Sequence, residues 1–96
     1  MDTKNLILIE NLCSNYNITF SFINSLHKQG LIEIVIIEEG QYLPDQQLNE
    51  VEKMIRLHQD LDINPEGIDV IFNLLEQIDQ LQRDLNTTKN RLRFFE

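Results

Sequence analysis

The chain has 96 residues, a length that suits one domain with a single modest core. Sixteen acidic residues against eight Lys and Arg give a net charge of −8 and an isoelectric point near 4.6. DNA-binding proteins draw much of their affinity from basic side chains that neutralise phosphates. The charge balance therefore argues against DNA, and it suits either a basic protein partner or a merely solvated surface.

Cysteine content and hydropathy narrow the class of protein further. Cys13 is the single cysteine, so no disulfide framework and no cysteine-based metal cluster is predicted. The opening MDTKNLILIENL lacks the basic segment and the long apolar run of a secretion signal. No stretch approaches the roughly 18 apolar residues of a membrane span. We therefore expect a cytoplasmic protein that makes no use of a membrane.

Two short helices are predicted in the first third of the chain. The first covers residues 10–16 and ends at a turn marked by Asn15 and Asn17. Thr19 is a favoured N-cap for the second helix, and Gly30 stands where a C-terminal cap belongs. The apolar side chains at helical spacing are Leu12, Cys13 and Tyr16 in the first helix, and Phe22, Ile23 and Leu26 in the second.

A hairpin, or wing, follows the second helix. Residues 31–37, LIEIVII, are a β-branched run that predicts a strand ending at Glu38-Glu39-Gly40. Residues 41–43 are expected to return as its antiparallel partner before Pro44 stops the pairing. A third helix is predicted from Asp45, with an apolar face made by Leu48, Val51, Ile55, His58 and Leu61.

Asn64 is predicted to cap a fourth helix, with Pro65 at its first position and Glu66 favoured by the helix dipole. This helix keeps a seven-residue apolar repeat in which only Thr88 is polar. The dimerisation residues that this repeat predicts are Ile71, Leu74, Ile78, Leu81, Leu85, Leu92 and Phe95. A helix of about 30 residues spans about 45 Å, more than a small head covers. We therefore expect a head at residues 1–63 and a helix at 64–96. The start of this helix should pack on the head, and its end should form a parallel or antiparallel coiled coil.

No motif in the sequence indicates catalysis. The three glycines lie at predicted element boundaries and form no phosphate-binding loop. His27 and His58 share no metal-ligand spacing, and His58 on an apolar face favours a hydrogen-bonded core histidine. Cys13, flanked by core positions, is better explained by packing than by reactivity. We expect no enzyme, no metal and no cofactor.

The order of these elements resembles the MerR-type winged-helix proteins, and four segments resemble the chaperone-modulator CbpM family in particular. These segments are ENLCSNYNI, HKQGLIEI, RLHQDLDINPEGIDVIFNLLEQIDQL and KNRLRFF, and together they cover nearly the whole chain. The resemblance implies a mainly α fold, a winged helix-turn-helix with a small β-hairpin wing and a long C-terminal coiled-coil helix. The resemblance also implies a protein that binds the J-domain of a DnaJ-like, CbpA-type co-chaperone and inhibits its stimulation of DnaK. The seven-residue repeat of the last helix predicts that this protein is a homodimer.

The alternative is a MerR-type DNA-binding transcriptional regulator. Such regulators usually carry Arg and Tyr near positions that here hold Asn24 and Leu26, and Tyr-Arg where this wing reads Glu39-Gly40. Residues 1–52 hold only two lysines against eight carboxylates. These departures favour a winged-helix fold that has lost its DNA contacts.

Two acidic groups are candidates for the contact with a partner, since charge steers association while buried groups hold the complex. The first group is the wing, with Glu38, Glu39 and Tyr42. The second is the corner between the third and fourth helices, with Asp60, Asp62, Glu66 and Asp69. For each residue the competing interpretation is an ordinary solvated surface.

Overall fold

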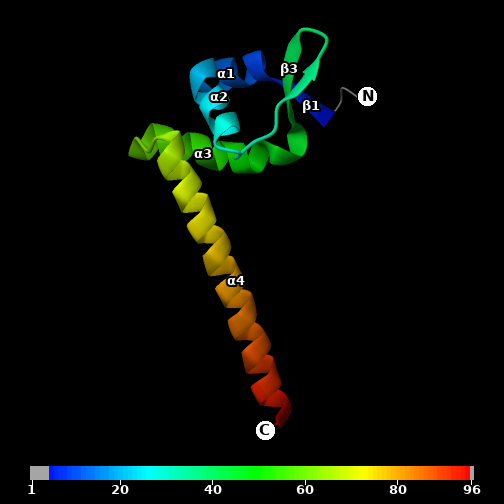
Figure 1. The fold of residues 1–96 in the computed structure, drawn as a ribbon, viewed down its shortest axis with the longest axis vertical. Coiled ribbons are helices and arrows are strands. Elements are labelled where there is room, and N and C mark those ends of the chain that lie inside the picture. Colours follow the sequence, from blue (N-terminus) through cyan, green and yellow to red (C-terminus); the bar gives the residue numbers. More distant parts are fainter. Residues whose placement is uncertain (1–4, 96) are drawn as a thin grey trace.

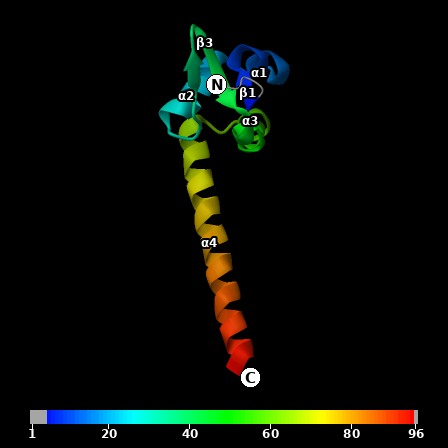
Figure 2. The ribbon, with the colours of Figure 1, turned by 90° about the vertical axis from the view of Figure 1, so that its right-hand side faces the viewer.

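The computed structural model describes residues 5–95 and extends 61 × 35 × 21 Å along its principal axes. Figures 1 and 2 show a small head from which one long helix projects. No helix within residues 5–95 is both long and apolar enough to cross a membrane. The elements are β1 (Leu6–Leu8), α1 (Ile9–Tyr16), α2 (Phe20–Lys28), β2 (Val35–Ile37), β3 (Gly40–Pro44), the 3-10 turn η2 (Asp45–Gln47), α3 (Leu48–Leu61) and α4 (Pro65–Phe95).

Helices α1 and α2 confirm the predicted helix-turn-helix. The turn is made by Asn17, whose φ of 55° places it in the left-handed region that ends α1. Thr19 caps α2 as predicted, because its hydroxyl accepts a hydrogen bond of 3.1 Å from the backbone N–H of Phe22. The predicted face of α2 is buried: Phe22, Ile23 and Leu26 are at most 6% exposed.

The wing is part of a three-stranded antiparallel sheet in the order β1-β3-β2. The hairpin of β2 and β3 pairs Ile37 with Gly40 across the two-residue turn Glu38-Glu39, as the sequence predicts. The strand β1 is not predicted by the sequence, and it pairs with the other side of β3. The expectation that Pro44 lies beyond the pairing is wrong, since Pro44 is the last residue of β3 and lies opposite Leu6.

The predicted strand over residues 31–37 is too long, because only its last three residues form β2. The backbone of the first four residues is engaged elsewhere. The N–H of Leu31 donates to the carbonyl of Leu26, which closes the end of α2 around Gly30. The carbonyl of Ile32 is bonded by the His27 ring, and the N–H of Glu33 by the side chain of Gln47. This segment therefore crosses from α2 to the sheet without pairing.

Helix α3 forms the side of the head from which α4 projects, and α4 starts close to the end of α3 (Figure 1). Val51 and Ile55 of the predicted face are buried, whereas the prediction for Leu61 is wrong, since 65% of its surface is exposed. Leu61 falls in the last turn of α3, past the edge of the core. The buried core collects side chains from the four helices, from β3 and from the segment before β2, namely Ile9, Leu12, Phe22, Ile23, Leu26, Ile32, Leu43, Val51, Met54, Ile55 and Ile68.

The N-terminus of α4 is built as predicted. The side-chain oxygen of Asn64 accepts a hydrogen bond of 2.8 Å from the N–H of Gly67, and Pro65 is the first helical residue. One turn further on, Ile68 is fully buried against the head. From there α4 runs away from the head to Phe95 (Figure 2).

Candidate partner-binding surface

Both histidine rings form a hydrogen bond with a backbone carbonyl group. The Nδ1 atom of His27 lies 3.2 Å from the carbonyl oxygen of Ile32, and that of His58 lies 3.0 Å from the carbonyl oxygen of Ile63. A carbonyl oxygen only accepts, so Nδ1 is the donor in both pairs. The His58 ring also stacks on Phe22, with centroids 4.2 Å apart and planes inclined by 18°. The prediction of a hydrogen-bonded histidine is confirmed, although the ring is half-buried and lies beside the core on Phe22.

Cys13 packs against the core, as predicted, and burial raises the pKa of its thiol. A raised pKa lowers the fraction of thiolate, the nucleophilic form. Within residues 5–95, no three side chains of His, Cys, Asp or Glu lie together in a way that could hold a metal ion.

The wing places its candidate residues around a tight turn. Glu38 and Glu39 are exposed at the turn, and Glu38 has a left-handed φ of 56°. The ring of Tyr42 lies over Gly40, so that a Cβ atom added there would come within 2.9 Å of the ring. Glu39 also borders a hollow of about 320 Å³ whose apolar lining is Leu8, Ile9, Cys13 and Phe20.

The corner holds its four carboxylates on either side of the turn from α3 to α4. Asp60, Asp62 and Glu66 are exposed, and Asp62 ends α3 with a left-handed φ of 55°. Asp69 is half-buried and accepts a hydrogen bond of 3.4 Å from the side chain of Asn73. The wing and the corner lie at different ends of the head (Figure 1), so the structure does not bring the two groups together.

The predicted dimer seam is a line of exposed apolar side chains along α4. Leu74 and Ile78 are each 50% exposed, and Leu81, Leu85 and Leu92 are more exposed still. Ile71, nearest the head, is half-buried. The polar position, Thr88, turns its hydroxyl back to the carbonyl of Asp84 at 3.0 Å. The side chain of Phe95 lies outside the described part of the structure, so the seam is seen up to Leu92.

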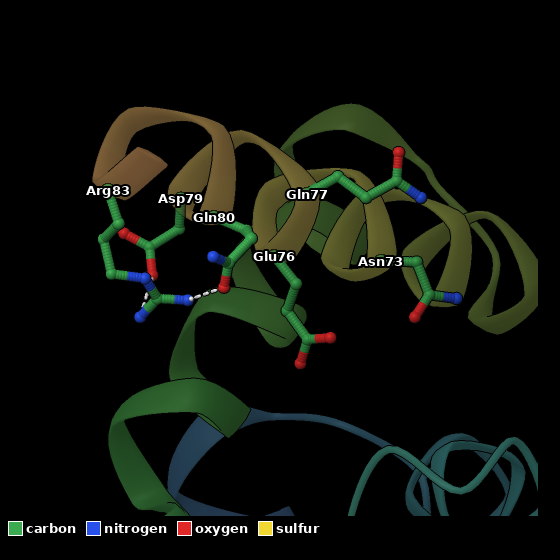
Figure 3. Close-up of a pocket in the computed structure, with 6 residues that line it drawn as sticks. All are labelled: Asn73, Glu76, Gln77, Asp79, Gln80 and Arg83. Atoms are coloured by element: carbon green, nitrogen blue, oxygen red, sulfur yellow. Dashed lines mark hydrogen bonds and ion pairs between the residues drawn. The ribbon is translucent and has the colours of Figure 1, made fainter. Parts of the chain in front are cut away.

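A hollow of about 700 Å³ is lined by residues of α4 alone (Figure 3). Arg83 is fixed there by Asp79 at 3.1 Å and by the side-chain oxygen of Gln80 at 2.8 Å. Because one helix supplies the whole lining, this hollow is open helix surface and encloses nothing. Glu76, at its edge, points towards α3, whereas Gln77 points away (Figure 3).

A helix-turn-helix followed by a small wing, with a long helix whose apolar seam is exposed, defines a protein of the winged helix-turn-helix class. The protein family described as "MerR HTH family regulatory protein" matches residues 7–90, so the chain belongs to this family. It is also similar to a protein of Pseudomonas putida named "Chaperone modulatory protein CbpM". The two are 29% identical over 82 residues, which cover 84% of this chain and 81% of the relative. No solved structure matches the chain. These findings confirm the resemblance to MerR-type and CbpM proteins.

Proposed function

We propose that this chain is a non-enzymatic chaperone modulator of the cytoplasm. It binds the J-domain of a DnaJ-like, CbpA-type co-chaperone and inhibits the stimulation of DnaK by that co-chaperone. The observation that carries the proposal is the likeness to a chaperone modulatory protein over most of both chains. The acidic head supports it, since residues 1–52 contain only two lysines against eight carboxylates and would attract a basic protein.

Calorimetric titration of the protein with a purified J-domain tests the binding. The heat of binding is expected to saturate at one J-domain per head. In a separate assay, the ATPase rate of DnaK stimulated by the co-chaperone should decrease as the protein is added. Absence of heat at about 100 μM, where a complex of micromolar Kd is saturated, contradicts the proposal for that J-domain. Circular dichroism of both proteins shows that each is folded.

We also propose that the chain acts as a homodimer, with residues 1–63 as the partner-binding head and residues 64–96 as the dimerising helix. The exposed seam from Leu74 to Leu92 supports this, because a row of apolar side chains on a helix gains most by pairing with a second helix. The acidic residues of the wing and the corner are the candidates that the sequence offers for the contact with the J-domain.

A second function, sequence-specific DNA binding, is favoured by membership of the MerR family. The charge of the head opposes it, because a DNA-binding surface needs cations where this head carries carboxylates. Gel retardation at low salt with operator-length duplexes from the neighbourhood of the gene distinguishes the two functions. A specific, salt-sensitive shift would favour the regulator, and no shift is expected.

A further inference from the structure

The inner side of the bend between α3 and α4 is hollowed. Three adjoining hollows of about 420, 330 and 330 Å³ share Glu50, and two of them share Phe72 and Glu76. They form one continuous depression from the segment after α2, across α3, to Asp79 in α4. We call this depression the elbow groove. Sequence reasoning missed it because its walls come from three segments far apart in the chain.

The floor of the elbow groove is apolar. Along α4, Phe72 and Leu75 continue the face that begins at the buried Ile68, since these residues recur at helical spacing. Phe72 is half-buried and Leu75 is 50% exposed, so the face is only partly covered by the head. The apolar lining of the groove consists of Leu31, Ile32, Met54, Phe72 and Leu75.

The rim of the groove is acidic. Its carboxylates are Glu33, Glu50, Asp69, Glu76 and Asp79. The one lysine on the rim, Lys53, pairs with Glu50 at 3.7 Å, and Asp79 pairs with Arg83 at 3.1 Å. Glu33, Asp69 and Glu76 form no ion pair within the described residues. The groove therefore offers surplus negative charge around a strip of apolar surface.

The groove and the predicted dimer seam occupy different faces of α4. At 100° per residue, the face of Phe72, Leu75 and Glu76 is turned by roughly 150° from the seam of Leu74, Ile78 and Leu81. A dimer paired through the seam would leave this face of α4 accessible. The two surfaces can therefore act in the same molecule.

We infer that the elbow groove binds a basic amphipathic helix, with an apolar ridge on Phe72 and Leu75 and with Lys or Arg side chains beside Glu50 and Glu76. A helix fits better than an extended segment, because the groove walls offer side chains and no sheet edge. A helix satisfies its own backbone hydrogen bonds, whereas an extended segment would find no backbone partner there. This inference rests on the proposed function and assigns it a surface.

Charge reversal with a matched control tests the inference. The double variant Glu50→Lys/Glu76→Lys and the control Glu10→Lys/Asp45→Lys, at exposed residues outside the groove, the wing and the corner, change the net charge equally. Calorimetry with the J-domain should show at least a tenfold loss of affinity for the groove variant and no more than a twofold loss for the control. An equal loss in both means that only net charge matters and overturns the inference. A larger loss for Glu38→Lys/Glu39→Lys than for the groove variant assigns the contact to the wing and overturns it as well.

A second, uncharged pair keeps the test decisive if charge reversal disturbs the fold. Leu75→Asn changes the groove floor, and Leu61→Asn changes a leucine of similar exposure outside the groove. Leu75→Asn should weaken binding at least fivefold and Leu61→Asn less than twofold, and the reverse order overturns the inference. If the unmodified protein binds no J-domain, the proposed function fails instead, so the two failures are distinguishable.

Discussion

Gly30 and Asp62 show how single residues end the helices of the head. Each has a left-handed backbone, with φ of 77° and 55° respectively. Asp62 directly follows α3, and Gly30 follows Gln29, the residue that caps α2. Glycine adopts this conformation without steric cost, whereas a residue with a Cβ atom pays roughly 1–2 kcal/mol. Gly30 is thus a specific conformational requirement of the turn between α2 and the segment that leads to β2.

We expect Gly30→Ala to lower the free energy of unfolding by about 1 kcal/mol. No atom lies within 4 Å of a Cβ atom added there, so the loss would be one of backbone conformation alone. Urea denaturation followed by circular dichroism measures it. Gln29→Ala, at a neighbour with ordinary helical φ, serves as the control and should change stability by less than about 0.5 kcal/mol. Equal stability of both variants would contradict the assignment.

The two histidines make the same hydrogen bond in different surroundings. His27 is exposed, whereas His58 is half-buried and stacked on Phe22. His58→Ala removes the stacked ring, leaves space beside the core and leaves the carbonyl of Ile63 without its donor, which together should cost about 2–3 kcal/mol. His27→Ala removes mainly the hydrogen bond and should cost about 1 kcal/mol or less.

Thermal and urea unfolding of the two histidine variants under identical conditions provide the measurement. Each variant is the control for the other, because both lose a ring that bonds the carbonyl five residues on. A loss at His27 as large as that at His58 would show that the hydrogen bond, and not the packing on Phe22, dominates.

At the scale of elements, helices were predictable from the sequence and strand pairing only in part. The side chains of Thr19 and Asn64 each accept a hydrogen bond from the backbone N–H three residues on. These helix starts therefore depend only on neighbouring residues, and the sequence predicts them. The strand β1 depends on β3, which lies far along the chain, and a three-residue apolar run carries no sign of that pairing. The run LIEIVII has the composition of one long strand, but only its last three residues form β2. The backbone of Ile32 and Glu33 is hydrogen-bonded to the side chains of His27 and Gln47 instead.

The candidate surface was harder to predict than the helices for a similar reason. The wing and corner carboxylates are neighbours in sequence, so they stand out when the chain is read in order. Glu50 borders one hollow with Glu33 and another with Glu76, and both hollows exist only in the folded head. One signal was local: the spacing of Ile68, Phe72 and Leu75 marks a second apolar face beside the seven-residue repeat.

The dimerising role predicted for α4 can be tested within one turn of the helix. Leu85→Asp places a carboxylate on the exposed seam, and Asn86→Asp places the same group on the next residue, off the seam. We expect the first variant to be monomeric at micromolar concentration and the second to remain dimeric, because a charge at a seam position is buried on pairing.

Light scattering coupled to size-exclusion chromatography gives the mass of both variants. Circular dichroism indicates whether α4 stays helical in the monomer. If the Leu85→Asp variant has the same mass as the unmodified protein, the seam does not hold the dimer, and a protein that is monomeric before any substitution contradicts the proposal directly.

For the molecule as a whole, the net charge should control the rate of association with a partner, and the apolar surface should control the rate of dissociation. The net charge of −8 acts at long range, so it governs how fast a basic partner arrives. The apolar floor at Phe72 and Leu75 acts only after contact, so it governs how long the complex lasts. Salt shortens the screening length from about 10 Å at 0.1 M to about 3 Å at 1 M, which weakens the first effect far more than the second.

Stopped-flow mixing with the J-domain should therefore show an association rate constant that falls with salt. We expect a decrease of at least about tenfold between roughly 20 and 500 mM NaCl, as is typical of association steered by charge. The dissociation rate constant should change by less than about threefold over the same range. Leu75→Asn provides the complementary control, because it should speed dissociation and leave the salt dependence of association unchanged. A salt dependence that lies mainly in dissociation would mean that ion pairs, and not the apolar floor, hold the complex together.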